Sequence, residues 1–232
     1  MKRGLVLVEG QTEEQFVNDC LAPYLLAKGL VLERPFIVNT KAVAAGPNVK
    51  GGVRTYSKVQ RDLRRLLLDS NAAVITTVLD YYALPGDFPG MQNRPAKNAR
   101  DRVEHVEAEW AAAVGDRRFV PHLALHEFEA WVFADPSCLE PFMFDDDAGA
   151  IEVISRIARA HQTPEDIDDG PMTAPSKRLL DLFGAYQKTL HGPLAVSAIG
   201  IERIRAVCPH FHRWLDRIEA IAGDEAPGPP GL

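Results

Sequence analysis

Short apolar runs that end on an acidic residue restrict the fold of this 232-residue chain more than any other feature of the sequence. The first run is GLVLVEG (4–10), and AAVITTVLDYY (72–82) repeats the same design. An apolar run of this length suits a strand that is buried on both faces, as the central strands of a parallel sheet are. We therefore expect a parallel sheet flanked by helices.

Segments with helical periodicity separate these apolar runs. In chain order, we expect helices at 12–28, 56–70 and 100–114 and further strands at 36–40 and within 118–133, where the strand ends in the polar cluster of His126, Glu127 and Glu129. Thr12 is the expected N-cap of the first helix, because its hydroxyl can accept a hydrogen bond from the backbone of the first turn. The alternation of strands and helices predicts an α/β domain with a mostly parallel central sheet.

The sequence changes character after FMFDDDAGA (142–150), and helical segments dominate the rest of the chain. These helices are expected at 150–161, 175–189 and 199–222. The predicted organisation is an α/β core over residues 1–145, a smaller C-terminal helical lobe packed on this core over 146–223, and a disordered tail over 224–232.

Composition limits the function in three ways. A formal charge of −6 argues against a generally basic nucleic-acid-binding protein, although it leaves room for a local basic groove. The three cysteines, Cys20, Cys138 and Cys208, form no CxxC pair, which argues against a disulfide framework or a zinc knuckle. No apolar run approaches the roughly 20 residues that span a membrane, and no signal peptide precedes the first strand, so a cytoplasmic protein is expected.

Acidic side chains emerge where the predicted strands end. Glu9 follows the first strand, Asp80 closes the second apolar run, and Glu127 and Glu129 follow the last. Ligands of parallel sheets bind outside the carboxyl ends of the strands. Clustered carboxylates repel one another unless a cation neutralises them, and Mg²⁺ or Mn²⁺ is the cation that oxygen ligands favour. Together with Glu13 from the next helix, these acids can hold one or two ions, and two ions are a standard arrangement for phosphodiester cleavage.

Structural roles are the alternative for most of these acids. Glu13 can simply complement the helix dipole in a first turn, and Asp80 can simply end a strand. One acid of the HEFEAW segment can face solvent, and His126 in that segment is more often a structural histidine than a ligand. Glu9 is the hardest to explain in this way, because an acid directly after LVLV has little structural use.

A resemblance to a known family rests on five motifs. They are VEGQTEEQF, VLDYYALP, LHEFEAWVF, APSKRLLDLF and CPHFHRWL. In this order they resemble the bacterial family called domain of unknown function 4276, over nearly the whole chain. That family is regarded as related to the Toprim fold and to the nuclease domains of overcoming-lysogenization-defect (OLD) proteins. The resemblance therefore implies that the α/β core is Toprim-like.

The resemblance also implies roles for single residues. In Toprim proteins the glutamate that ends the first strand before a glycine, as Glu9 does, is implied to bind metal or to act as general acid or base. Glu13 matches a second metal-binding acid of OLD-type nucleases, and Asp80 matches the first acid of an Asp-x-Asp pair. Tyr82 stands where the second acid is expected, which puts two-metal catalysis in question. Either an acid of HEFEAW replaces that ligand or a single ion binds.

Phosphate contacts require basic residues, and three groups are available. They are Lys50, Arg54 and Lys58 around a glycine-rich loop, Arg61, Arg64 and Arg65 on the next helix, and Lys177 with Arg178 in the C-terminal region. OLD-type nucleases are understood to place a late basic residue near the metals, and the resemblance makes Lys177 the candidate. For the three helix arginines, a solvated helix face is the alternative.

Two functions are therefore expected from the sequence. The first is a metal-dependent phosphodiesterase, most simply a nuclease acting on DNA or RNA, with Glu9, Asp80 and Lys177 as its catalytic residues. The resemblance implies an anti-phage role together with an ATPase. That ATPase would be a separate protein, because this chain has no GxxxxGK[ST] motif. The second is a catalytically incomplete module that binds or regulates a partner protein. A homodimer is left open, and no membrane association is expected.

Overall fold

The computed structural model describes residues 1–38, 55–82, 84–143, 147, 149–167, 170 and 173–223. Its strands are β1 (Lys2–Val8), β2 (Leu30–Leu32), β3 (Phe36–Ile37), β4 (Val74–Asp80), β5 (Phe119–Val120) and β6 (Leu123–Ala124). Its α-helices are α1 (Gln11–Phe16), α2 (Ala22–Ala27), α3 (Tyr56–Leu67), α4 (Ala99–Val114), α5 (Ala150–Arg159), α6 (Pro175–Leu182), α7 (Lys188–Ile199), α8 (Ile201–Val207) and α9 (Pro209–Gly223). The glycine-rich loop 46–53 and the tail 224–232 lie outside the described residues.

The sheet has the parallel topology that the sequence predicts. Its strands run in the order β2-β1-β4-β5, with β3 also paired to β1 and β6 also paired to β4. Every strand pair in the described part of the chain is parallel. Val8, the last residue of β1, lies opposite Val78, and β4 continues from there to Asp80, so the two central strands end at the same edge of the sheet. The predicted α/β fold with a mostly parallel central sheet is confirmed.

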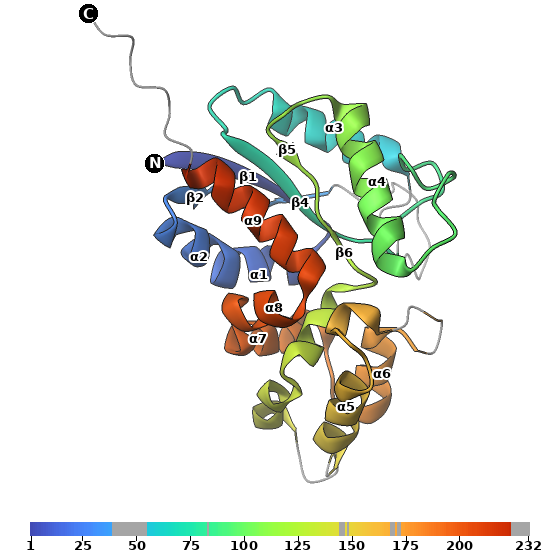
Figure 1. The fold of residues 1–232 in the computed structure, drawn as a ribbon. Helices are drawn as coiled ribbons and strands as arrows, with labels where there is room; N and C mark the ends of the chain where they lie inside the picture. The colour runs from blue at the N-terminus through green and yellow to red at the C-terminus, as the bar shows by residue number, and fades with distance from the viewer. Residues whose placement is uncertain are drawn as a thin grey trace, which may run out of the picture.

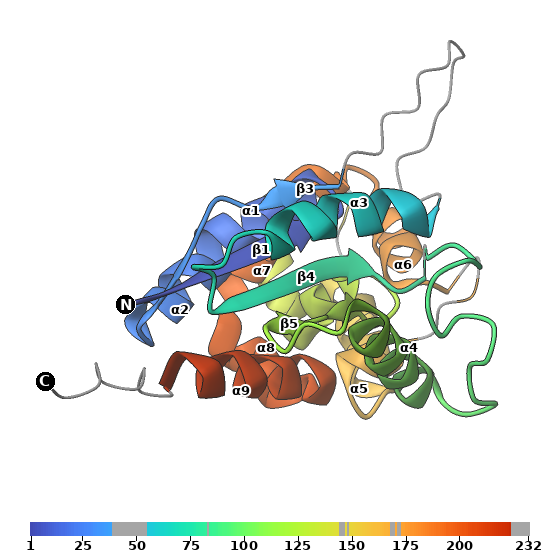
Figure 2. The same ribbon diagram turned by 90° about the horizontal axis from the view of Figure 1, so that it is seen from above.

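Helices cover both faces of this sheet because alternate side chains of a strand point to opposite sides. Val6 and Val8 of β1 pack into a core with α1, α2 and the C-terminal helices α7, α8 and α9. Leu5 and Leu7 point to the opposite face and pack with α3 and α4. Figure 1 shows these two layers, and Figure 2 shows α3 and α9 on opposite sides of β4.

Two expected elements break where the backbone cannot continue them. The strand expected within 118–133 before His126 is divided into β5 and β6, which are separated by Pro121 and His122. Phe128–Ala134 then forms a 3-10 segment. Proline lacks the amide hydrogen that a sheet ladder requires. The expected helix 175–189 ends at Leu182, and a new helix, α7, begins at Lys188. Gly184 lies in the break, and glycine has a low helix propensity.

The first helix also differs in detail from its prediction. It begins at Gln11, and its N-cap is Gly10 in extended conformation rather than Thr12. The Glu13 side chain accepts a hydrogen bond from the backbone N–H of Gly10 at 2.8 Å, and this bond fixes the start of the helix. A π-helical turn, Val17–Leu21, then joins α1 to α2.

The C-terminal helices take two different positions. α9 packs on the sheet, where Trp214 Nε1 donates a hydrogen bond to Thr76 Oγ1 of β4 at 2.8 Å. α6 lies beyond the end toward which the β4 arrow points (Figure 2). α6 and the start of α7 are therefore placed near the carboxyl ends of the strands.

In the described part of the chain, no helix is long and apolar enough to cross a membrane.

Candidate functional site

The acids that follow β1 and β4 are joined by a direct contact. Glu9 comes directly after β1, and Asp80 is the last residue of β4. Because the two strands are adjacent and parallel, Glu9 Oε2 accepts a hydrogen bond from the backbone N–H of Asp80 at 3.0 Å. The topology thus brings both residues to one edge of the sheet, as parallel pairing requires.

The two acids in the first turn of α1 lie in different surroundings. Glu13 is buried, and its carboxylate is held by the N–H of Gly10, directly after Glu9. Glu14 instead forms an ion pair with Arg34, at 3.3 Å between Nη2 and Oε1. Glu13 therefore belongs with the strand-end acids, and Glu14 does not.

Glu127 and Glu129 reach the same place from the segment after β6. Asp80 Oδ1 accepts a hydrogen bond from the N–H of Phe128, between these two glutamates, at 2.9 Å. Glu127 Oε2 in turn accepts a bond from the N–H of Ser176 in α6, also at 2.9 Å. Both glutamates are buried. We call Glu9, Glu13, Asp80, Glu127 and Glu129 the acidic cluster.

The backbone entering this segment is strained. His126, directly before Glu127, has a φ of +68°, and it is the described non-glycine residue with a positive φ. L-residues with a side chain seldom adopt this region, and such outliers concentrate at functional sites. The strain is held in place by the burial of His126 and by the hydrogen bond from the N–H of Tyr82 to its carbonyl oxygen at 3.2 Å.

The acidic cluster carries more negative charge than its surroundings stabilise. Burial and the nearby carboxylates of Glu9, Glu13, Glu129 and Glu127 raise the pKa of Asp80 well above its usual range. Burial, followed by the charge of Glu9, raises the pKa of Glu13 to about 7. Burial also raises the pKa values of Glu9 and Glu129. A cation would relieve the repulsion that these shifts reflect.

Lys188, the first residue of α7, is the basic residue that contacts this cluster. Its Nζ lies 3.4 Å from Glu129 Oε1 and 3.8 Å from Glu127 Oε1. Burial alone would lower the pKa of Lys188, but the carboxylates of Glu129, Glu127 and Asp80 outweigh it and raise that pKa. The ammonium group therefore stays charged between the carboxylates.

Two hydroxyl groups lie beside the same carboxylates without a hydrogen-bond partner among the described residues. They are the buried Ser176 Oγ and Tyr186 Oη. Burial and the charges of Glu129 and Glu127 raise the pKa of Tyr186, which keeps its hydroxyl protonated. A buried hydroxyl without a protein partner is available to bind a water molecule, an ion or a ligand.

The other residues expected at the site lie elsewhere. Lys177 is exposed on α6, next to the backbone group that binds Glu127. The side chain of Tyr82 is exposed. Arg61 and Arg65 of α3 both pair with Asp62, as expected for a solvated helix face. Lys50 and Arg54 lie outside the described residues.

The residues of the acidic cluster fit a hard divalent cation. Glu9, Glu13 and Asp80 each use one carboxylate oxygen to accept a backbone N–H, which leaves the second oxygen of each for an ion. Oxygen ligands of this kind select Mg²⁺, Mn²⁺ or Ca²⁺. In the described residues, no three of these acids bring ligand atoms within 4.8 Å of one another, so the carboxylates would close up around an ion.

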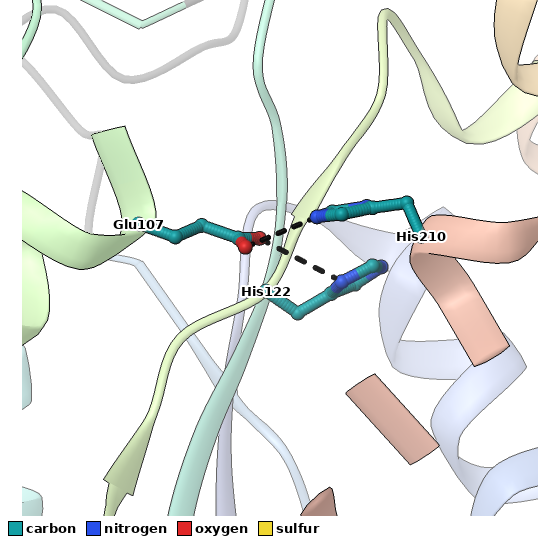
Figure 3. Close-up of side chains that lie close together, drawn as sticks. All are labelled: Glu107, His122 and His210. Atoms are coloured by element: carbon teal, nitrogen blue, oxygen red, sulfur yellow. Dashed lines mark hydrogen bonds and ion pairs between the residues drawn. The ribbon is translucent and has the colours of Figure 1, made fainter. Parts of the chain in front are cut away.

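A second group of buried ionisable residues lies between α4 and α9. It consists of Glu107 from α4, His122 between β5 and β6, and His210 from α9, and we call it the histidine cluster (Figure 3). Glu107 Oε2 lies 3.0 Å from His210 Nε2, and Glu107 Oε1 lies 3.8 Å from His122 Nδ1. One ligand atom from each residue lies within 4.8 Å of the others, as in a site for a divalent metal.

Neither Lys188 nor the histidine cluster was predicted from the sequence. A lysine in the first turn of a helix opposes the helix dipole, so Lys188 at the start of α7 is a signal that something else stabilises it. His122 and His210 lie in the segments VPHLAL and CPHFHRWL, but Glu107 is one of several acids on α4. Three residues from separate elements leave no spacing that sequence reasoning can use.

Three comparisons place the chain among known proteins. The profile of the family described as "Domain of unknown function (DUF4276)" matches residues 8–219. No curated protein matches the chain. Among solved structures, the C-terminal region of the Burkholderia pseudomallei OLD protein is similar over 96% of this chain and 100% of that chain, with 16% sequence identity and a TM-score of 0.44. A score of this size marks a distant likeness, and no residue role is transferred from it.

Proposed function

Since the chain belongs to the DUF4276 family, which carries no assigned activity, we propose from its acidic cluster that it is a metal-dependent phosphodiesterase of Toprim-like type, acting on nucleic acid. One observation carries this proposal. Four segments deliver five carboxylates to the carboxyl ends of adjacent parallel strands, and in the described part of the chain one lysine, Lys188, lies between two of them. Such a surplus of buried negative charge has no structural use, but it is what a catalytic divalent ion requires.

The residues divide naturally into two roles. Glu9, Glu13 and Asp80 would hold Mg²⁺ or Mn²⁺ through their second oxygens, with Glu129 close by. When bound, such an ion lowers the pKa of a water molecule and stabilises negative charge on a phosphate. Lys188 adds a fixed positive charge, and the hydroxyls of Ser176 and Tyr186 can donate hydrogen bonds to phosphate oxygens.

Lys188 takes the role that the sequence resemblance assigned to Lys177. Both residues come late in the chain, as the resemblance requires, but only the Lys188 ammonium contacts the acidic cluster. Lys177 remains a candidate for contacting nucleic acid outside the site, because it is exposed one residue away from Ser176. A separate ATPase partner and an anti-phage role stay part of the proposal on the resemblance alone.

A catalytically incomplete binding module is the second candidate. Two observations favour it: Tyr82 stands where a second strand-end acid is expected, and Lys188 already neutralises part of the charge on Glu127 and Glu129. In such a module the lysine would serve as a permanent substitute for the metal.

Hydrolysis assays on the full chain separate the two candidates. Wild type is incubated with single- and double-stranded DNA and RNA, in Mg²⁺ or Mn²⁺, with and without any ATPase encoded nearby. The enzyme proposal expects cleavage that Glu9→Gln and Asp80→Asn abolish while nucleic-acid binding persists, because each variant keeps the shape and removes one negative charge.

Glu14→Gln is the matched control for these variants. Glu14 lies in the same first turn as Glu13 but pairs with Arg34, so this variant should cleave like wild type. A wild-type protein that cuts no substrate under any of these conditions, yet forms a stable complex with the ATPase, contradicts the enzyme proposal and supports the binding module.

A further inference from the structure

The histidine cluster lies apart from the proposed active site and has the donor atoms of a different kind of metal. The three donor groups are two imidazoles and one carboxylate, and all three residues are buried. Imidazole nitrogen suits Zn²⁺ and related transition metals, whereas the all-oxygen acidic cluster suits Mg²⁺ or Mn²⁺. The two clusters should therefore select different ions.

Each ligand of this cluster is held in position by its neighbours. The Glu107 carboxylate accepts a hydrogen bond from the N–H of Leu123 at 2.8 Å through Oε1. The His122 ring stacks on the Trp214 ring at 4.2 Å between centroids and on the His210 ring at 4.8 Å. Glu165 anchors the start of α9 by accepting the N–H groups of His210 and Phe211, both at 2.9 Å.

The cluster also contains buried nitrogen atoms that its protein surroundings do not satisfy. Both ring nitrogens of His122 and Nδ1 of His210 lack a hydrogen-bond partner among the described residues. His122 is 1% exposed, and its Nδ1 points toward the Glu107 carboxylate (Figure 3). A buried imidazole nitrogen aimed at a carboxylate without bonding to it fits a position where a metal ion lies between them.

The spacing and access are also suitable. Two ligands of a tetrahedral Zn²⁺ with bonds of 2.0–2.1 Å lie about 3.3 Å apart. The donor atoms here lie within 4.8 Å of one another, so shifts on the order of 1 Å would complete the geometry. A cavity of about 330 Å³, lined by Glu107 and His210 among others, reaches the cluster and leaves room for water as a fourth ligand.

We propose that Glu107, His122 and His210 form a binding site for Zn²⁺ or a similar transition metal, separate from the acidic cluster. The site joins α4, the β5–β6 segment and α9, which are distant in sequence. An ion bound to all three would cross-link the C-terminal helix to the sheet, so its binding should stabilise the folded chain.

Titration of the full, tag-free chain with Zn²⁺ and Co²⁺ tests this site. Excess Mg²⁺ is present throughout, so that the acidic cluster is occupied. We expect one equivalent of Zn²⁺ to bind and to raise the melting temperature by about 5–10 °C at a hundredfold excess over Kd. Co²⁺ should bind at the same stoichiometry and show the intense visible absorption of a tetrahedral nitrogen- and oxygen-ligated ion.

Three variants show whether the ion lies at this cluster. Glu107→Gln keeps the hydrogen bond to Leu123, and His122→Phe keeps the stacked ring, so each removes a ligand with little change of shape. Both should lose the Co²⁺ spectrum and the Zn²⁺-dependent rise in melting temperature. His212→Phe is the control and should behave like wild type. His212 lies on α9, as His210 does, but it pairs with Asp216 on the surface.

Two results would overturn the proposal. In one, wild type binds neither ion and its melting temperature does not move, which makes the cluster a buried hydrogen-bonded group only. In the other, the wild type and both ligand variants bind equally, which places the ion elsewhere. Circular dichroism of the apo variants confirms that each is folded, and His122→Phe alone decides the matter if Glu107→Gln does not fold.

Discussion

The acidic cluster and the histidine cluster are both built from buried ionisable side chains, yet their charges are balanced differently. Among the described residues, the acidic cluster sets five carboxylates against the ammonium of Lys188, and burial together with this surplus of negative charge raises the pKa values of Asp80 and Glu13. In the histidine cluster, one carboxylate faces two imidazoles. The comparison teaches that a charge surplus marks a place for chemistry, whereas a near-balance marks a place where elements are joined.

Removing Glu107 from the histidine cluster should therefore destabilise the folded chain strongly. Glu107→Ala leaves the imidazole of His210 and the N–H of Leu123 buried without their partner. We expect the free energy of unfolding to fall by about 3–5 kcal/mol, measured by urea denaturation. Glu109→Ala, an exposed site on the same helix, should change it by less than about 0.5 kcal/mol. Equal losses in the two variants would show that Glu107 is an ordinary surface acid.

The next largest effect should come from Lys188, the lysine in contact with the acidic cluster. Lys188→Ala removes the charge placed to stabilise the phosphate and should lower kcat by about 10²–10³-fold at saturating Mg²⁺. Lys177→Ala should lower it far less and act mainly on substrate binding. Lys188→Arg, which keeps the charge, should recover part of the activity. A larger loss in Lys177→Ala than in Lys188→Ala would restore the role that the sequence resemblance gave to Lys177.

The smallest effect is the pH dependence of stability in EDTA. The folded pKa of Glu13 is raised to about 7, so the folded state binds more protons than the unfolded state between about pH 4.5 and 7. Stability is therefore fully present below this window and is lost as pH rises through it. We expect the free energy of unfolding to drop by roughly 2–3 kcal/mol between pH 5 and pH 8. Glu13→Gln should make this drop smaller, and the raised pKa values of Asp80, Glu9 and Glu129 account for what remains.

Magnesium should reverse the pH profile of the wild type, because an ion needs the carboxylates in their charged form. The same denaturation series with millimolar Mg²⁺ checks this expectation. A wild-type profile in EDTA that rises with pH over the same window would show that the acidic cluster is not under repulsion.

The sequence predicted those parts of the molecule that depend on neighbours in the chain. The apolar runs before Glu9 and Asp80 specified β1 and β4, because a buried strand needs such runs whatever surrounds it. The meeting of Glu9 and Asp80 could be predicted as well, since adjacent parallel strands end at the same edge of a sheet. The strand expected within 118–133 is present as two short strands before the polar cluster, because Pro121 interrupts pairing after two residues.

The sequence could not predict contacts that only tertiary packing creates. Lys188 contacts Glu129 because α6 ends at Leu182 and a new helix, α7, begins at Lys188. The expected single helix over 175–189 would have directed the lysine elsewhere. Glu107 and His210 are likewise brought together by the packing of α9 on the sheet, which no local pattern encodes.

The hydrogen bonds of the acidic cluster form a chain with a consequence for biosynthesis. Glu9 is held by the backbone of Asp80, Asp80 by that of Phe128, and Glu127 by that of Ser176. Each of these three carboxylates is thus oriented by a segment that leaves the ribosome later than itself. A partly synthesised chain cannot assemble the cluster until α6 has docked. If the protein cuts nucleic acid, the cell is protected from it while it is being made.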